Sequence, residues 1–481
     1  MNNRKLILKA GGILALLTAM AWLHVYAAPG FHLPDYDTHR YAWNARQLAA
    51  GHFNELFHHL APLYQLTLAA VWLLFPRIEV WIALGAVVYA LVCVYWCSQT
   101  VHHLWQRIAL FLLLQLTPLL FYHNGGLQTT PFYFLGFTVW WQFYRRRPQA
   151  GIPTRIEAFW WGVWLALEYK SIFWLSGLWL YDARQFITRP NRQLLLRYIK
   201  RGGHVLWVPV LLVAVGTRLG VPWWRYPAAW IYLFFRKEYL RQSTFDVLFH
   251  FKYLLYYEPV ALIGILATLL FWLGRKKYLP QKSMQPLCFI ALWLLLLMSF
   301  LPKAPRGILL SLVVGYTFFV QGLEQLLPLS ASYRKILTGL GVGIALGVSA
   351  YRLLPYATYL PPYKEAARRL SPYIHEKQTI HSVLCLAPAL YLPMEVSFQI
   401  HFKQELNSRP LLVSDAALLF YGEEALHALR KQATWTLPHP FLGFPLLHLE
   451  SAEFYGQSYE QALELAARLK KQQASIYFLS H

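Results

Sequence analysis

The sequence predicts a polytopic α-helical membrane protein of about 11–13 membrane helices, followed by a small α/β domain outside the membrane. Hydrophobic residues make up 57% of the 481 residues, whereas charged residues make up only 14%. Apolar runs rich in Leu, Trp, Phe and Tyr recur over residues 1–354 and are too long for an ordinary soluble core. From about residue 355 the composition changes, which marks a second domain over residues 355–481.

The distribution of basic residues explains the net charge of +22 without nucleic acid. Short segments between apolar runs hold 20 of the 44 Lys and Arg residues, at 1–9, 98–107, 145–157, 182–203, 275–285 and 328–335. Only Glu157 and Asp182 oppose them there. Basic residues concentrated in short loops are typical of the cytoplasmic side of a membrane protein. We therefore expect these segments to be cytoplasmic and expect no nucleic-acid partner.

The N-terminal stretch "MNNRKLILKAGGILALLTAMAWLHVYAAPG" has a basic start and small residues near its end, as a cleaved signal peptide would. It is long for a signal peptide, and its loss would disturb the charge pattern of the loops, so we expect an uncleaved first span. Spans are expected at 6–28, 80–98, 107–122, 128–144, 156–169, 171–186, 204–220, 258–274, 286–301, 307–325 and 335–354.

The apolar run 60–75, "LAPLYQLTLAAVWLLF", has two interpretations. As a full span it would place the "RRR" of 145–147 outside, whereas as a short helix on the outer leaflet it leaves every basic loop inside. We expect the short helix. The outward loop 29–79 then carries juxtamembrane helices, and it faces the same side as 121–130, 168–170, 222–257, 302–307 and the C-terminal domain. The aromatic and basic loop 222–257 is typical of an interfacial helix.

In the C-terminal domain, "YKEAARRLSPYIHEK" and "YEQALELAARLKKQQ" have the periodicity of amphipathic helices, while "TIHSVLCLA" and "ASIYFLS" are typical of short strands. The domain holds 11 basic and 11 acidic residues, so its net charge creates no strong electrostatic field. It shows no glycine-rich phosphate loop, no metal-spaced cysteine set and no catalytic triad pattern.

Two aspartates, Asp35 and Asp37, follow the first span. Asp37 precedes the amphipathic stretch "THRYAWNARQLAAG", so one role for it is the N-cap of a surface helix, with Gly51 suited to the C-terminal end. A carboxylate near the apolar boundary can also have a raised pKa and act as a general base. One aspartate can fill both roles.

Three cations stand at outward span ends against the general bias of the loops: Lys170 in "LALEYKSIF", and Lys303 and Arg306 in "FLPKAPRGILL". One interpretation is an interfacial cation or an ion pair, such as Lys170 with Glu168. The other is a site for a phosphate leaving group, which arginine binds bidentately.

The adjacent pair His58 and His59 raises the question of a metal site. Adjacent histidines point in different directions on most backbones, and no fixed spacing to other histidines supports a metal-ligand set. We therefore expect polar interfacial histidines that line a substrate cleft, and no metal ligands.

Together these segments resemble the type C fold (GT-C) glycosyltransferases that use polyprenyl-phosphate sugars, which include the protein mannosyltransferases and the lipid A aminoarabinose transferases. The likeness covers residues 1–350 in architecture, through short motifs. "DTHRYAWNAR" is similar to the acidic loop and following helix of the family, which places its catalytic aspartate on Asp37, with Asp35 beside it and Arg40 and Tyr41 in the cleft. "APLY" is similar to the family's membrane-surface segment and adds Tyr64 to the cleft.

The resemblance also implies roles for the cations. "LALEYK" and "KAPR" are similar to family segments that place Lys170, Lys303 and Arg306 near the lipid phosphate. Many relatives carry a second acidic residue in the next outward loop, but "FYHNGGLQTT" has none, and Asn124 or Gln128 occupies that region. This departure disfavours a divalent metal that bridges two acids, so no cofactor is expected to be required.

The resemblance implies a membrane enzyme that transfers a sugar, with inversion, from a polyprenyl-phosphate donor to a lipid, glycan or protein acceptor. Its site and C-terminal domain are expected on the extracytoplasmic side of the inner (plasma) membrane. Two alternatives stay open. A lipid or polysaccharide transporter would need ionisable residues near the middle of several spans, whereas here they lie mainly at span ends. A catalytically idle relative would fit the missing second acid.

Overall fold

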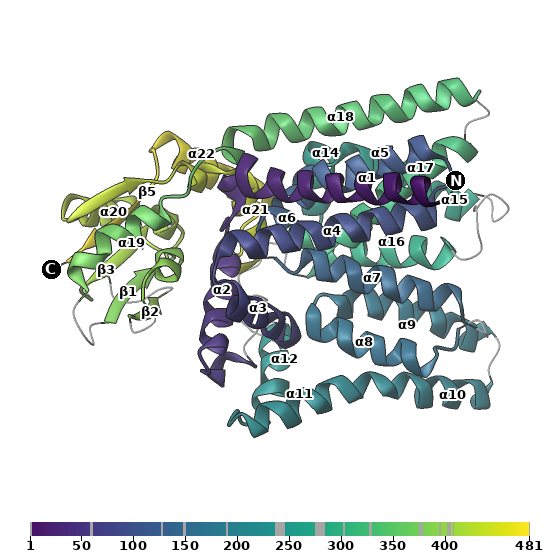
Figure 1. Ribbon diagram of the computed structural model, residues 1–481, viewed down its shortest axis with the longest axis horizontal. Coiled ribbons are helices and arrows are strands. Elements are labelled where there is room, and N and C mark those ends of the chain that lie inside the picture. Colours follow the sequence, from purple (N-terminus) through teal and green to yellow (C-terminus); the bar gives the residue numbers. More distant parts are fainter. Residues whose placement is uncertain are drawn as a thin grey trace.

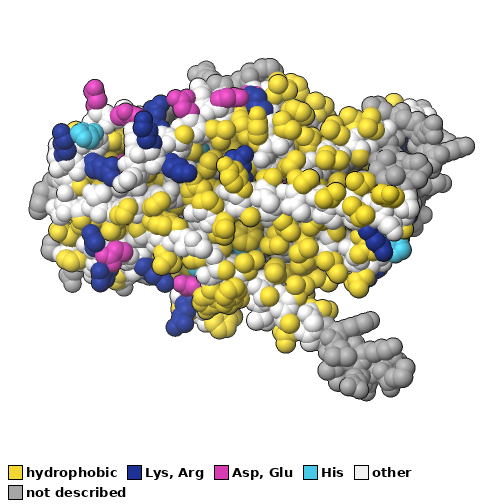
Figure 2. All heavy atoms as spheres, turned by 90° about the horizontal axis from the view of Figure 1, so that it is seen from above, with side chains coloured by type: hydrophobic (Ala, Val, Ile, Leu, Met, Phe, Trp, Pro, Cys, Tyr) yellow, Lys and Arg dark blue, Asp and Glu magenta, His cyan; other side chains and the backbone are white. Residues whose placement is uncertain are grey.

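The computed structural model describes residues 2–57, 61–126, 128–147, 151–188, 191–235, 246–274, 284–301, 304–326, 330–374, 379–393, 396–401, 406 and 408–480. Figure 1 shows a bundle of helices that run side by side, with a small sheet domain beyond one end and the N-terminus at the other. Figure 2 shows a largely hydrophobic face over the bundle, while charged side chains gather over the C-terminal domain.

The helices of the bundle follow the predicted spans. They are α1 (Asn2–Trp22, continued by a π-helical turn, Leu23–Ala27), α4 (Ile78–Thr100), α5 (Leu104–Leu116), α6 (Pro118–Gly125), α7 (Thr130–Arg145), α8 (Arg155–Leu167), α9 (Ser171–Thr188), α10 (Arg192–Gly202), α11 (Trp207–Arg218), α15 (Pro259–Gly274), α16 (Gln285–Phe300), α17 (Leu309–Leu326) and α18 (Ala331–Ala357). Four stretches among the described residues are long and apolar enough to cross a membrane, or five if α5 and α6 form one broken span. The chain is thus a multi-pass membrane protein.

Two predicted spans differ from the structure. The span expected at 107–122 is broken at Thr117, where α5 and α6 meet at 60°. Pro118 cannot continue the helix, and the N–H of Leu119 donates instead to the Glu258 carboxylate at 2.9 Å. The span expected at 204–220 begins earlier, because a continuous helical stretch runs over Arg192–Arg218.

The segments between spans form helices at the end of the bundle that faces the sheet domain. They are α2 (Tyr36–Ala49), α3 (Pro62–Leu74), α12 (Arg225–Phe235) and α14 (Phe249–Tyr257). In Figure 1, α2 runs across the ends of the bundle helices. The 13 residues of α3 extend about 20 Å, which is too short for a ~30 Å hydrocarbon core, as expected for the run 60–75. Gly51, with φ of +85°, turns the chain after α2.

Close packing within the bundle depends on small residues where helices cross. A Cβ atom on Gly264 of α15 would collide with the backbone oxygen of Gly315 on α17, so only glycine permits this approach. The buried interior is otherwise rich in aromatic rings, with Trp96, Trp140 and Trp174 fully buried.

The C-terminal domain holds one mixed five-stranded sheet in the order β2-β1-β3-β5-β4. Its strands are β1 (Thr379–Val383), β2 (Ser397–His401), β3 (Leu411–Ser414), β4 (Trp435–Pro438) and β5 (Ser475–Leu479), and its helices are α19 (Tyr363–Leu370), α20 (Glu423–Lys431), α21 (Pro445–Tyr455) and α22 (Tyr459–Lys471). The β1–β2 and β1–β3 pairs are parallel, while β5 pairs antiparallel with β3 and β4. Both predicted helices and both predicted strands are present.

Buried polar contacts join the C-terminal domain to α2. The guanidinium of Arg46 donates to the backbone oxygens of Ala389 at 2.9 Å and Leu392 at 2.5 Å. The ring of His39 packs edge-on against Tyr363, whose hydroxyl lies 2.8 Å from His439 Nε2. The domain is therefore held directly against the segment that carries the two predicted aspartates.

Candidate functional site

The first turn of α2 places the two aspartates in different surroundings. Asp35, rather than Asp37, is the N-cap: it has an extended backbone, and its carboxylate accepts the Thr38 N–H at 2.8 Å. The capping role predicted for Asp37 is therefore wrong by two residues, because Tyr36 and Asp37 already lie in the first turn. Asp37 therefore does not cap the helix, and its side chain is 19% exposed.

Asp35 is buried in a polar cluster that includes Gln128. The Gln128 amide nitrogen lies 3.0 and 2.9 Å from the two carboxylate oxygens of Asp35 and 2.8 Å from the Thr38 hydroxyl. Burial, followed by the neighbouring charge of Asp37, raises the pKa of the Asp35 carboxyl, while Arg306 opposes the shift. Gln128 is one of the two residues, with Asn124, that occupy the loop in which a second acid was sought, and it donates to Asp35.

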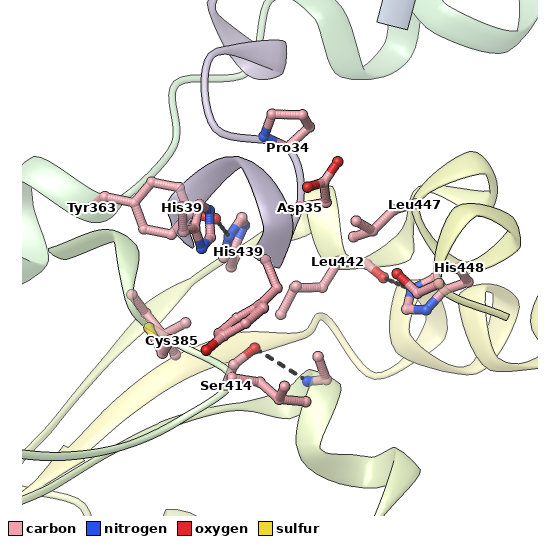
Figure 3. A pocket seen from close by; sticks show the side chains of 15 residues that line it. Pro34, Asp35, His39, Tyr363, Cys385, Ser414, His439, Leu442, Leu447 and His448 are labelled. Carbon is pink, nitrogen blue, oxygen red and sulfur yellow. Dashed lines mark hydrogen bonds between the residues drawn. The ribbon is translucent and has the colours of Figure 1, made fainter. Parts of the chain in front are cut away.

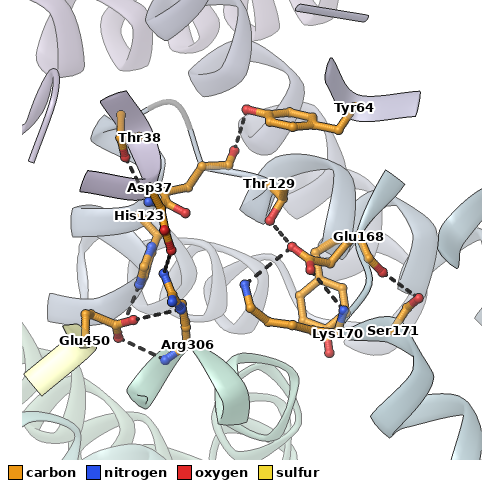
Figure 4. Close-up of polar contacts among 12 residues, drawn as sticks. Asp37, Thr38, Tyr64, His123, Thr129, Glu168, Lys170, Ser171, Arg306 and Glu450 are labelled. Atoms are coloured by element: carbon orange, nitrogen blue, oxygen red, sulfur yellow. Dashed lines mark hydrogen bonds and ion pairs between the residues drawn. The ribbon is translucent and has the colours of Figure 1, made fainter. Parts of the chain in front are cut away.

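Asp37 forms an ion pair with Arg306. Its carboxylate lies 2.6 Å from Arg306 Nη1. Glu450 of α21 contacts the same arginine twice, through the backbone N–H at 2.9 Å and through Nε at 3.6 Å, and it lies 3.3 Å from Nε2 of His123 on α6. Figure 4 shows Asp37 and Glu450 on different sides of Arg306. Residues 269 and 144 positions apart in the chain thus meet around one guanidinium.

A second polar group lies beside this cluster, at the turn between α8 and α9. The Glu168 carboxylate accepts hydrogen bonds from the Thr129 hydroxyl and, at 2.9 Å, from the backbone N–H of Lys170. It also lies 3.5 Å from the Lys170 amine. The Lys170–Glu168 ion pair, one of the interpretations left open for Lys170, is therefore present. The Lys170 side chain is 27% exposed, and its amine points toward the Arg306 side of the cluster (Figure 4).

Tyr41 and Tyr64 are buried next to these charges, with ring centroids 5.1 Å apart. Burial, then the charges of Glu168 and Asp37, raise the pKa of the Tyr41 hydroxyl well above its ordinary value. The Tyr64 hydroxyl donates to the backbone oxygen of Gln128 at 3.0 Å. Arg40 lies half-buried on α2. The structure thus brings both predicted tyrosines to the site.

Three predicted site residues, His58, His59 and Lys303, lie outside the described residues. Among the residues that are described, no group of three or more His, Cys, Asp and Glu side chains could hold a metal ion.

A cavity of about 50 Å³ separates the start of α2 from the C-terminal domain. Figure 3 shows Asp35 and three histidines, His39, His439 and His448, around it. Burial lowers the pKa of these histidines to about 4, 3 and 4, respectively, so they are neutral at physiological pH. The cavity is too small for a sugar and has room for a few water molecules.

Comparison with known proteins identifies the fold. No protein-family model and no curated protein matches the sequence. The solved structures that match include ArnT from Cupriavidus metallidurans bound to undecaprenyl phosphate, which is 13% identical, covers 98% of both chains and has a TM-score of 0.58. Its apo state matches with the same identity and coverage and a TM-score of 0.55. The chain has the GT-C fold of ArnT. The predicted fold class is confirmed over the whole chain, the C-terminal domain included.

Sequence reasoning missed two members of the polar cluster around Arg306, Glu450 and His123. Glu450 belongs to a domain expected to carry no chemistry, and its contact with Arg306 spans 144 positions. The available signal was the apolar run "FLGFPLLHLE", which is unusual in a soluble domain and ends on a lone acid. His123 lies in the outward loop "FYHNGGLQTT", and a histidine whose partner is a distant glutamate gives no local signal in the sequence.

Proposed function

We propose that the protein is a membrane glycosyltransferase that moves a sugar from a polyprenyl-phosphate donor to an extracytoplasmic lipid, glycan or protein acceptor. The observation that carries this proposal is the ion pair between Asp37 and Arg306 at the end of the bundle, in a chain that has the ArnT fold throughout. It unites a carboxylate suited to deprotonate an acceptor with a guanidinium suited to a phosphate.

The position of this pair fits a lipid-linked donor. The bundle beneath it is apolar, so a polyprenyl chain can stay in the bilayer while its phosphate reaches the bundle end. ArnT from Cupriavidus metallidurans has been solved with undecaprenyl phosphate, a ligand of this class. The concentration of basic residues in the loops at the other end supports an extracytoplasmic position for this end, in the inner membrane.

The proposed reaction is one displacement at the anomeric carbon. The acceptor hydroxyl or amine attacks that carbon while Asp37 accepts its proton. The bond between the anomeric carbon and the phosphate oxygen breaks, and its electron pair goes to the departing phosphate. Arg306, Lys170 and Lys303 stabilise the negative charge that this oxygen gains. Asp35 and Gln128 hold the first turn of α2, and with it Asp37, in place.

Donor binding then has to alter the Asp37–Arg306 pair. A carboxylate that is held 2.6 Å from a guanidinium is a weak base, because the cation favours its charged form. A phosphate that binds Arg306 replaces Asp37 as the partner of the guanidinium and frees the carboxylate for the acceptor. The base therefore becomes competent when the donor is in place.

Lipid analysis of cells that lack the protein tests this function. We expect a polyprenyl-phosphate sugar to accumulate and one glycosylated envelope component to disappear, and we expect the wild-type gene to reverse both changes. In addition, purified wild-type protein should bind undecaprenyl phosphate. No accumulation together with no binding would contradict the proposal.

A further inference from the structure

We infer that Glu450, supplied by the C-terminal domain, is the positioning residue that holds Arg306 ready for the donor phosphate. This inference rests on the proposed function, which makes Arg306 a phosphate ligand. It gives the C-terminal domain a part in the site, whereas the sequence suggested none.

Glu450 contacts the backbone of Arg306 and the part of the guanidinium nearest to that backbone. One oxygen accepts the Arg306 backbone N–H at 2.9 Å, and the other lies 3.6 Å from Nε. Asp37 contacts the opposite end of the side chain, at Nη1. Glu450 can therefore remain bound while the partner at Nη1 changes from a carboxylate to a phosphate oxygen.

The position of Arg306 in the chain explains why its side chain needs a contact that restricts it. It lies in a short 3-10 turn, Pro305–Ile308, that follows an extended residue, Ala304, and precedes α17. A long, flexible side chain on a turn loses conformational entropy when it binds a ligand, and that loss weakens binding. The hydrogen bond to the backbone of the turn and the nearby charge at Nε restrict the side chain in advance, which reduces this loss.

Burial shows that the contact is built into the fold. The Glu450 side chain is 1% exposed, and a buried carboxylate is costly unless cations or donors face it. Arg306, with 8% of its side chain exposed, and His123, with 1%, face it from two different elements of the bundle. A role limited to joining the two domains would not need an arginine that also contacts Asp37.

The C-terminal domain delivers Glu450 through the segment that leads into α21. Phe441 and Phe444 in this segment pack against Phe31, which follows the first span, with ring centroids 5.8 and 5.7 Å apart. Phe444 also packs against Tyr122, the neighbour of His123, at 5.4 Å. These aromatic contacts place the start of α21, and so Glu450, against the bundle end.

A double-mutant cycle on undecaprenyl phosphate binding by the full-length purified protein tests this inference. The variants are Glu450→Gln, Arg306→Ala and the double mutant. Glu464→Gln is the matched control, because Glu464 lies in the same domain, is 70% exposed and pairs with Arg468 on the surface. We expect Glu450→Gln to weaken binding about tenfold in the wild-type background and to change it by less than about twofold in the Arg306→Ala background. The control should bind as the wild type does.

Other outcomes contradict the inference. Equal effects of Glu450→Gln in both backgrounds would mean that Glu450 does not act through Arg306. Unchanged or tighter binding would mean that it does not hold the arginine for phosphate. If the wild type itself fails to bind undecaprenyl phosphate, both the proposed function and this inference fall. If the wild type binds and Arg306→Ala weakens binding, only the role of Glu450 is at stake.

Discussion

Arg306 is the residue on which the site depends, because it links the bundle, α2 and the C-terminal domain. Its neighbours Asp37 and Glu450 are two carboxylates that would repel each other without it. Removing one partner of a buried ion pair typically costs about 3–5 kcal/mol, since the other charge is left uncompensated. Arg306 is also proposed to bind the phosphate. The effects of its positive charge and of its planar shape on binding therefore have to be tested separately.

Substitution of Arg306 by lysine makes that separation. Arg306→Lys keeps the charge but loses the planar fork that contacts Asp37 and Glu450 at different nitrogens. We expect a folded protein whose affinity for undecaprenyl phosphate falls about tenfold, measured by titration in lipid nanodiscs. Wild-type affinity in Arg306→Lys would show that only a positive charge is needed there.

At the scale of elements, the first turn of α2 is the support of the proposed base. Asp35 caps the helix and bonds to Gln128, so it determines where Asp37 lies. The loss of an N-cap costs about 1 kcal/mol. A cap elsewhere in the chain with no link to the site provides the comparison.

We therefore expect Asp35→Ala to lower the free energy of unfolding by about 1 kcal/mol and also to reduce the rate of sugar transfer. Asn191→Ala, which removes the cap of α10 at the end of the bundle away from the sheet domain, should cost a similar amount of stability and leave transfer unchanged. Melting curves and donor turnover in membranes measure the two effects. Equal transfer in the two variants would mean that the cap of α2 has no bearing on the reaction.

The sequence was sufficient for the elements and for the residues on local motifs. The apolar runs predicted the spans, and the resemblance of "DTHRYAWNAR" and "KAPR" to family segments led to Asp37 and Arg306, which do meet. The sequence was insufficient where a single residue determines the end of a helix, or where two contacting residues lie far apart in the chain. Asp35 and Asp37 are both good caps by composition, and the bend at Thr117 depends on Glu258, which lies 139 positions from its partner Leu119. Glu450 reaches the site only through tertiary packing.

At the scale of the whole molecule, the joint between the bundle and the C-terminal domain contains buried neutral histidines. Burial lowers the pKa of His39 to about 4 and that of His439 to about 3, from 6.5. Between pH 6.5 and about 4 the unfolded chain therefore binds protons that the folded chain does not bind. The stabilisation is complete above pH 6.5 and is lost as the pH falls through this window.

We expect the melting temperature to fall between pH 7.5 and pH 5, and expect His439→Gln to show a smaller fall. His427→Gln is the control, because His427 is exposed on α20. The difference in melting temperature between the two pH values is the quantity to compare. An unchanged difference in His439→Gln would contradict the buried, neutral state of this histidine.

The most direct test of the central claim is the amount of polyprenyl-phosphate sugar in a deletion strain that carries either wild-type protein or Asp37→Asn. Asparagine keeps the shape of the side chain but cannot accept the acceptor proton, and such a loss typically costs a factor of about 10²–10⁴ in rate. We predict that Asp37→Asn is expressed and binds undecaprenyl phosphate at least as tightly as the wild type, because a competitor for Arg306 is gone, yet leaves the lipid-linked sugar at the level of the deletion. Full clearance of that lipid by Asp37→Asn would contradict the account.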